Sequence, residues 1–200
     1  MRRRKQIRLR GYDYSLPGAY FITLCTKDRK NRLARVVNSR ARRSAIGEAV
    51  SRCWKEIPDH QTGVEVDEFV VMPNHVHGVV VILDSSMQAE NSGRRVQLNT
   101  PTGNRFSRIS PKAGSLGVIV RTFKAAVTTW CRANGFPEFA WQRGFYEHII
   151  RDEHSLQRIR EYIDANPRRW VLDTENRERI GKDDSERWMR TFTRRPSGER

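Results

Sequence analysis

The chain has 200 residues, of which 37% are hydrophobic and 30% are charged, and its formal net charge is +15 at pH 7. This length fits one domain with a single hydrophobic core. Most of the 38 basic residues are arginines, whose planar guanidinium groups match phosphate oxygens, so the composition favours a nucleic-acid partner. We expect neither a membrane span nor a secretory signal, because no apolar run has the required length. The three cysteines have no metal-binding spacing, which favours free thiols in a reducing cytosol.

The hydrophobic pattern predicts an α+β fold with the element order β-α-β-β-α-β-α. The predicted elements are a strand over 20–26, a helix over 44–57, strands over 64–72 and 75–83, a helix over 115–134, a strand over 145–150 and a helix over 153–166. Residues 27–43 are predicted to be a polar connection and 84–114 a flexible loop. The first six elements match the ferredoxin-like, or split βαβ, arrangement, an antiparallel sheet with two helices on one face. The third helix is extra.

Two histidines, His75 and His77, flank Val76 at the start of the third predicted strand. Because side chains alternate along a strand, both imidazoles point to the same face, where they could hold one divalent metal ion. Any isolated pair of this kind could also consist of ordinary strand residues with satisfied hydrogen bonds. The pair alone therefore leaves both interpretations open.

The last predicted helix carries Tyr162 and Asn166, which lie one turn apart on the same side. Asn166 offers an amide oxygen as a third ligand beside the two histidines, and Tyr162 offers a phenol that could attack a phosphate polarised by the metal. Nitrogen and oxygen ligands without a thiolate suit Mg²⁺ or Mn²⁺. The alternatives are a core tyrosine and an asparagine that ends the helix before Pro167. Tyr146, next to a plausible base, is a rival nucleophile.

Three sequence blocks, in this order, resemble the REP-associated tyrosine transposases of the single-tyrosine His-hydrophobic-His (HUH) superfamily. The blocks are Pro-Asn-His-Val-His at 73–77, Trp-Gln-Arg-Gly-Phe-Tyr-Glu-His-Ile-Ile-Arg at 141–151 and Glu-Tyr-Ile-Asp-Ala-Asn-Pro at 161–167. The resemblance implies a bacterial, cytoplasmic enzyme that cleaves and rejoins single-stranded DNA next to palindromic hairpin repeats through a 5′-phosphotyrosine. It implies Tyr162 as the nucleophile, and His75, His77 and Asn166 as ligands of Mg²⁺ or Mn²⁺.

The resemblance and the basic composition also predict how the chain meets DNA. We expect a transposase-like domain over 1–172, followed by a polar, basic tail over 173–200, and either a monomer or a homodimer. Trp141, Gln142 and Arg143 could bind an unpaired base or pack under the sheet. The candidate nucleic-acid contacts are Arg2, Arg3, Arg4, Trp141, Gln142, Arg143, His148, Arg168 and Arg169.

Two other functions fit the same sequence. A non-catalytic module that binds single-stranded nucleic acid would use the same sheet and the same arginines. A metal-dependent phosphodiesterase that activates water would use the histidines without the tyrosine.

Overall fold

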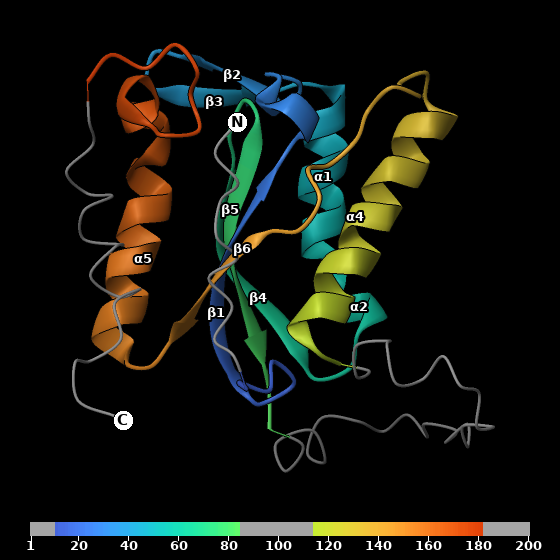
Figure 1. Ribbon diagram of the computed structural model, residues 1–200, viewed down its shortest axis with the longest axis vertical. Coiled ribbons are helices and arrows are strands. Elements are labelled where there is room, and N and C mark those ends of the chain that lie inside the picture. The colour runs from blue at the N-terminus through green and yellow to red at the C-terminus, as the bar shows by residue number, and fades with distance from the viewer. Residues whose placement is uncertain (1–10, 85–113, 182–200) are drawn as a thin grey trace.

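Figure 1 shows the computed structural model, in which residues 11–84 and 114–181 are described. A four-stranded antiparallel sheet occupies the centre, with the strand order β4-β5-β1-β6. Its strands are β1 (Gly18–Cys25), β4 (Val64–Val71), β5 (His75–Ile82) and β6 (Tyr146–Ile150). This order makes β4 and β6 the edge strands and places β5, which carries both histidines, beside β1 in the middle of the sheet.

Helices cover both faces of the sheet. The helices α1 (Ala45–Lys55), α2 (Ile57–His60) and α4 (Leu116–Ala133) lie on one side, and α5 (Glu153–Ala165) lies on the other (Figure 1). Short 3-10 helices follow β1 and α5, namely η1 (Lys27–Arg29) and η3 (Asn166–Leu172). The predicted split βαβ fold is confirmed, and the extra helix takes the face that the other helices leave open.

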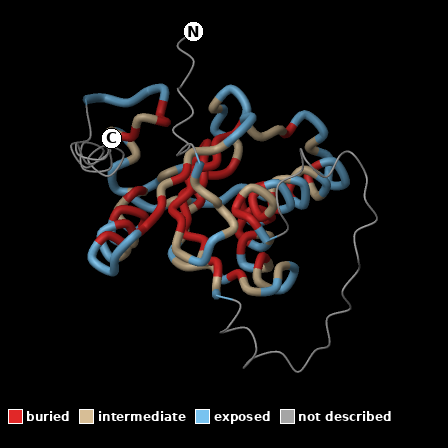
Figure 2. Tube along the Cα trace, turned by 60° about the horizontal axis from the view of Figure 1, so that its bottom comes forward, coloured by how far each residue is buried: buried red, intermediate tan, exposed pale blue. Residues whose placement is uncertain are grey.

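Alternation along β1 explains why both faces are covered. Tyr20, Ile22 and Leu24 pack in the large core under α1 and α4, whereas Phe21 packs in a smaller core under α5. A strand whose two sides are both apolar must be covered on both faces. Figure 2 accordingly shows the central strands buried, while the outer sides of the helices are exposed.

Residues 27–43 were expected to be a polar connection, and this prediction was wrong for most of them. The segment contains a two-stranded hairpin, β2 (Ala34–Val37) and β3 (Arg40–Arg43). Its turn residues, Asn38 and Ser39, both have the positive φ values that a tight hairpin requires, 49° and 58°. Because β3 is almost entirely arginine, the hairpin has no alternation of apolar and polar residues that would reveal it.

Two prolines were expected to end helices, and each lies instead in the first turn of a further helix. The helix expected over 44–57 stops at Lys55, and Pro58 lies in the first turn of α2. Similarly, Pro167 lies in the first turn of η3, directly after α5. Proline is accepted at these positions because the first turn of a helix leaves its N–H groups without intrahelical acceptors.

Several predictions fall on residues outside the described ranges. These are the contacts of Arg2, Arg3 and Arg4, nearly all of the expected loop over 84–114 and the tail beyond residue 181. Within residues 11–84 and 114–181, no helix combines the length and the apolar character that crossing a membrane requires.

Gly78 tests the packing behind the histidine strand. A Cβ at this position would lie 2.3 Å from Trp54 Cζ2 and 3.1 Å from Phe69 Cβ, and Trp54 is fully buried. We therefore expect Gly78→Ala to lower the free energy of unfolding by about 1–3 kcal/mol in urea denaturation. Combined with Trp54→Phe, it should cost less than the sum of the two single changes. An unchanged denaturation midpoint for Gly78→Ala would contradict this packing.

Candidate active site

His75 and His77 lie on the face of β5 that α5 covers. Their imidazoles are buried, with 0% and 3% of each residue exposed, and the ring centroids are 4.4 Å apart. The strand register places Cys25 and Thr23 of β1 directly opposite them. The two rings are thus held side by side in the middle of the sheet, as the alternation of the sequence predicts.

Hydrogen bonds on the Nδ1 atoms orient both rings. Asn74 Oδ1 lies 2.9 Å from His75 Nδ1, and Thr23 Oγ1 lies 2.9 Å from His77 Nδ1. The Asn74 amide is itself oriented, because its Nδ2 donates to the carbonyl oxygens of Arg29 and Glu175 at 3.2 and 2.8 Å. A carbonyl oxygen can only accept, so His75 Nδ1 donates, and Nε2 is the ring atom left to bind a metal ion.

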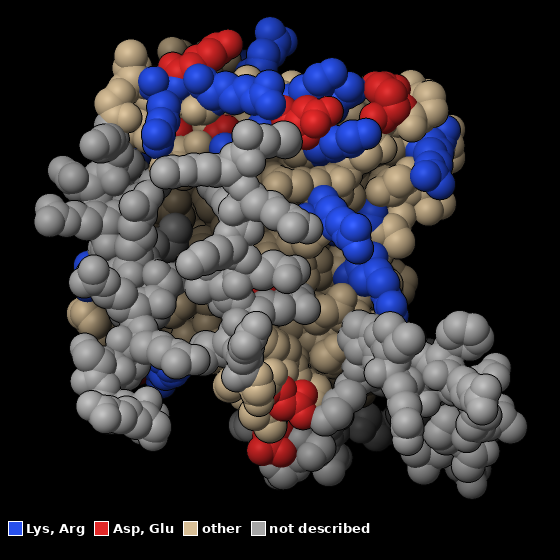
Figure 3. Space-filling view, viewed as in Figure 1, with Lys and Arg blue, Asp and Glu red and all other residues tan. Residues whose placement is uncertain are grey.

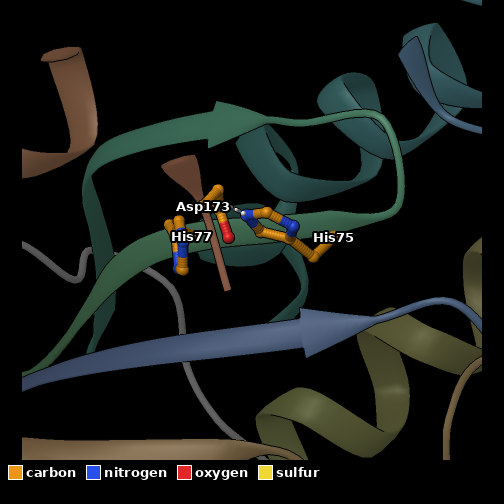
Figure 4. Close-up of side chains that lie close together, drawn as sticks. All are labelled: His75, His77 and Asp173. Atoms are coloured by element: carbon orange, nitrogen blue, oxygen red, sulfur yellow. Dashed lines mark ion pairs between the residues drawn. The ribbon is translucent and has the colours of Figure 1, made fainter. Parts of the chain in front are cut away.

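A carboxylate faces the two imidazoles. Asp173, at the end of η3, places Oδ2 3.6 Å from His75 Nε2, and one ligand atom from each of His75, His77 and Asp173 lies within 4.8 Å of the others (Figure 4). All three residues are buried. Sequence reasoning missed Asp173, because it lies in a polar segment without periodicity, where we expected the tail to begin.

The segment that carries Asp173 is anchored to the body of the protein. Glu175 N–H donates to Asp173 Oδ1 at 2.7 Å, and Glu175 Oε2 forms an ion pair with Arg29 Nε at 3.1 Å. Asp173, Glu175 and Asn176 are all buried. The first residues of the expected tail are therefore packed against the site, and the aspartate carboxylate is held in a fixed position.

Tyr162 reaches the same cluster of side chains from α5. Its hydroxyl oxygen lies 3.5 Å from His77 Nε2, and its ring makes an edge contact with Phe21. One turn later, Asn166 is also buried, and its Oδ1 accepts no hydrogen bond from any residue within 11–84 or 114–181. A buried amide oxygen left in this state is costly unless a ligand binds it.

Burial lowers the pKa of His77 well below its ordinary value, and the neighbouring His75 lowers it further. Both effects disfavour the positively charged ring. His77 is therefore neutral near pH 7, which is the state in which an imidazole binds a metal ion.

The Trp-Gln-Arg segment lies at the end of β1. Trp141 packs against Phe123 and Phe139, whereas Gln142 and Arg143 are exposed. Lys124 on α4 fixes this turn by donating to the carbonyl oxygens of Gln142 and Gly144 at 2.9 and 2.6 Å. Burial lowers the pKa of Lys124 to about 8.

The remaining candidates lie around the pocket. Tyr146 and His148 share the α5 face of the edge strand β6, opposite Thr23 and Phe21 respectively. Burial, and then the charge of Arg151, lower the pKa of His148 to about 4. Arg168 and Arg169 are exposed, and Arg168 forms an ion pair with Asp164 at 2.8 Å.

One ion pair fixes α5 over the sheet. Arg160 Nε and Nη2 contact the two carboxylate oxygens of Asp67 on β4 at 3.0 and 2.6 Å. Such a two-point contact holds the helix in position as well as stabilising it. Tyr162 lies two residues further along the same helix, so the pair helps to place the phenol.

The structure defines a split βαβ protein in which two histidines and a carboxylate converge with a tyrosine from the extra helix. No known family model matches the chain. It is 40% identical over 172 residues to an uncharacterized protein of Haemophilus influenzae, a match that covers 85% of this chain and 91% of that protein. The chain therefore belongs to the same protein family as the Haemophilus protein.

The chain was also compared with solved structures. A REP-associated tyrosine transposase bound to a REP hairpin aligns with a TM-score of 0.50 and 20% identity, over 82% of this chain and 73% of its own. A Deinococcus radiodurans protein provisionally assigned as a transposase aligns with a TM-score of 0.40 and 18% identity, over 78% and 95%. The first likeness confirms the fold that the sequence resemblance predicts.

A double-mutant cycle tests the contact that holds α5. We expect Asp67→Asn and Arg160→Gln to show a coupling energy of about 1 kcal/mol at pH 7 in urea denaturation. Arg160 lowers the pKa of Asp67, so this stabilisation is complete above the ordinary pKa of the carboxyl group. It should fade in acid as pH falls through the lowered pKa. Strictly additive effects at pH 7 would show that the pair does not hold the helix.

The acid stability of the fold tests His148. The pKa of His148 is about 4 in the folded protein and near 6.5 in the unfolded chain. Between pH 4 and 6.5, the unfolded chain therefore binds a proton at His148 that the folded protein does not bind. We expect stability to fall as pH drops from about 6.5 to 4, and the fall to be smaller in His148→Gln. Parallel profiles for the two proteins would refute the assigned shift. The measurement is the melting temperature across this pH range.

Proposed function

We propose that this protein is a metal-dependent, single-stranded DNA endonuclease and strand transferase. In this proposal it cleaves and rejoins DNA next to palindromic hairpin repeats through a 5′-phosphotyrosine intermediate. The observation that carries the proposal is the 3.5 Å approach of the Tyr162 hydroxyl to His77 Nε2, beside the buried cluster of His75, His77 and Asp173. The ring of Tyr162 belongs to the small core under α5, and its hydroxyl lies at the polar end beside the histidines.

The donor atoms of the pocket fit a divalent cation. One nitrogen from each imidazole and the Asp173 carboxylate lie within reach of one ion. We propose the buried amide oxygen of Asn166 as a further ligand. Mixed nitrogen and oxygen donors suit Mn²⁺ or Mg²⁺, and the carboxylate strengthens this preference. When bound, the ion would polarise the scissile phosphate and offset its negative charge.

Tyr162 is proposed as the nucleophile. Its oxygen would attack phosphorus as the phenol loses its proton, the P–O3′ bond would break, and the 3′ oxygen would take up a proton. The tyrosine ester keeps the energy of the broken bond, so rejoining by a 3′-hydroxyl needs no nucleotide cofactor.

The proposed substrate is hairpin DNA with single-stranded flanks. The fold neighbour at a TM-score of 0.50 was solved with a REP hairpin, and the net charge of +15 here suits a polyanion. We propose phosphate or base contacts from Arg2, Arg3, Arg4, Trp141, Gln142, Arg143, His148, Arg168 and Arg169. Of these, Gln142 and Arg143 combine exposure with a turn that Lys124 holds in place.

A covalent-adduct assay tests this function. The full chain is incubated with Mn²⁺ or Mg²⁺ and a labelled hairpin pool whose single-stranded flanks are randomised, and the products are separated on a denaturing protein gel. We expect a labelled adduct that Tyr162→Phe abolishes and that His75→Ala and His77→Ala strongly reduce. Tyr146→Phe is the matched control, because it removes the same hydroxyl from a neighbouring strand and should leave the adduct intact.

Each alternative gives a different pattern in the same assay. An adduct lost in Tyr146→Phe but kept in Tyr162→Phe would move the nucleophile to β6. Cleavage without an adduct would indicate a phosphodiesterase that uses water. Binding without cleavage in either metal would indicate a non-catalytic module, and both of the last two results would overturn the proposal.

A further inference from the structure

A cavity of about 400 Å³ lies beside the proposed catalytic pocket, on the edge of the sheet. Its walls come from the β2–β3 hairpin, the end of the edge strand β4 and the junction of α5 with η3. The volume is in the range of about 300–1,000 Å³ that small-molecule sites in proteins occupy. None of the residues that we predicted for metal binding or for the nucleophile lines it.

The register of the sheet fixes how close this cavity is to the catalytic pocket. Val70 lines the cavity and pairs with His77 across β4 and β5, so one strand spacing of about 5 Å separates the two positions. On the helix side, Asp164 and Pro167 line the cavity and flank Asn166 in the sequence. A polymer whose phosphate lay at the catalytic pocket could therefore place its next unit in the cavity.

The lining combines two chemistries. Val70 and Pro167 provide an apolar surface, whereas the rim carries three arginines: Arg40, Arg43 and Arg168. Phe69 and Val71 border the cavity along the strand, but their side chains point to the other face of the sheet, where Phe69 stacks on Trp54 and Val71 is buried in the large core. A small anion would contact only the arginines, and an apolar ligand would contact only the apolar surface. A nucleotide has both a flat base that packs on apolar side chains and a phosphate that binds guanidinium groups.

Charge and hydrogen-bonding groups point to the same ligand. Lys and Arg side chains gather along the end of the molecule where β2 and β3 lie, interspersed with acidic side chains (Figures 1 and 3). Around the cavity itself, Arg43 forms an exposed ion pair with Glu48 and Arg168 one with Asp164, whereas Arg40 lies on the rim at the start of β3. Asn38 and Ser39, at the tip of the hairpin, add polar groups to the lining.

We propose that this cavity binds one unpaired nucleotide of the single-stranded DNA that flanks the scissile phosphate. The inference rests on the proposed function, which identifies the polymer as DNA. It adds the site at which the protein binds the single strand. The hairpin β2–β3, which the hydrophobic pattern of the sequence does not reveal, then has a role: it supplies the arginine side of this site.

Fluorescence anisotropy in EDTA tests the site without any cleavage. Two labelled hairpins are compared, one blunt and one with single-stranded flanks, against the full chain and two variants. Arg40→Ala combined with Arg168→Ala removes charge from the rim, and Ala41→Trp, also in the lining, fills the cavity. Arg132→Ala removes one positive charge away from the cavity and serves as the surface control, because this exposed residue lies at the end of α4 on the other face of the sheet.

We expect both variants to weaken binding of the flanked hairpin about tenfold or more. Ala41→Trp should leave the blunt hairpin unaffected. The double arginine variant should also bind the flanked hairpin with a weaker salt dependence. The slope of log K against log salt concentration should fall by about one for each phosphate that the protein no longer neutralises. Equal losses on both hairpins in Ala41→Trp, or no loss beyond that of Arg132→Ala, would overturn the proposal. Melting curves check that each variant is folded. Because this assay needs no chemistry, its outcome is separate from that of the adduct assay.

Discussion

Two hydrogen bonds, one on the Nδ1 atom of each histidine, fix the orientation of the imidazole rings on which the candidate site depends. Asn74 and Thr23 hold the rings so that Nε2 of His75 faces Asp173 and Nε2 of His77 faces Tyr162. Partners of this kind normally orient imidazoles that bind metals. Burying polar groups in the sheet is costly for stability, so a pocket of this composition is better explained by function than by folding.

Most of the fold could be predicted from local pattern. The strands have a hydrophobic period of two residues, and the long helices that cover the sheet have a period of 3.6 residues. Their order along the chain could therefore be predicted from the sequence. The hairpin β2–β3 was missed, because its arginine-rich strand is exposed and carries no such period. Its one local signal was the Asn38-Ser39 pair, residues that tolerate the left-handed backbone of a tight turn.

The candidate site could be predicted only in part. His75, His77 and Tyr162 come from motifs on regular elements, and the structure brings them together. Asp173 could not be found in this way. It enters the pocket through a segment with no period, and its position depends on long-range contacts of Arg29 and Asn74 with Glu175. Contacts between irregular segments impose no regular spacing of residues along the sequence. They are therefore found only in the three-dimensional structure.

The proposed metal site is tested most directly by a Mn²⁺ titration of the full chain, in which the electron paramagnetic resonance signal reports the free ion. We expect one bound ion per chain, and no bound ion in His75→Ala or His77→Ala. Thr23→Val, which keeps the shape of the side chain but removes the hydrogen bond to His77, should weaken binding about tenfold or more. Absence of binding, or an affinity that the histidine changes leave untouched, would contradict the claim that this pocket is a metal centre.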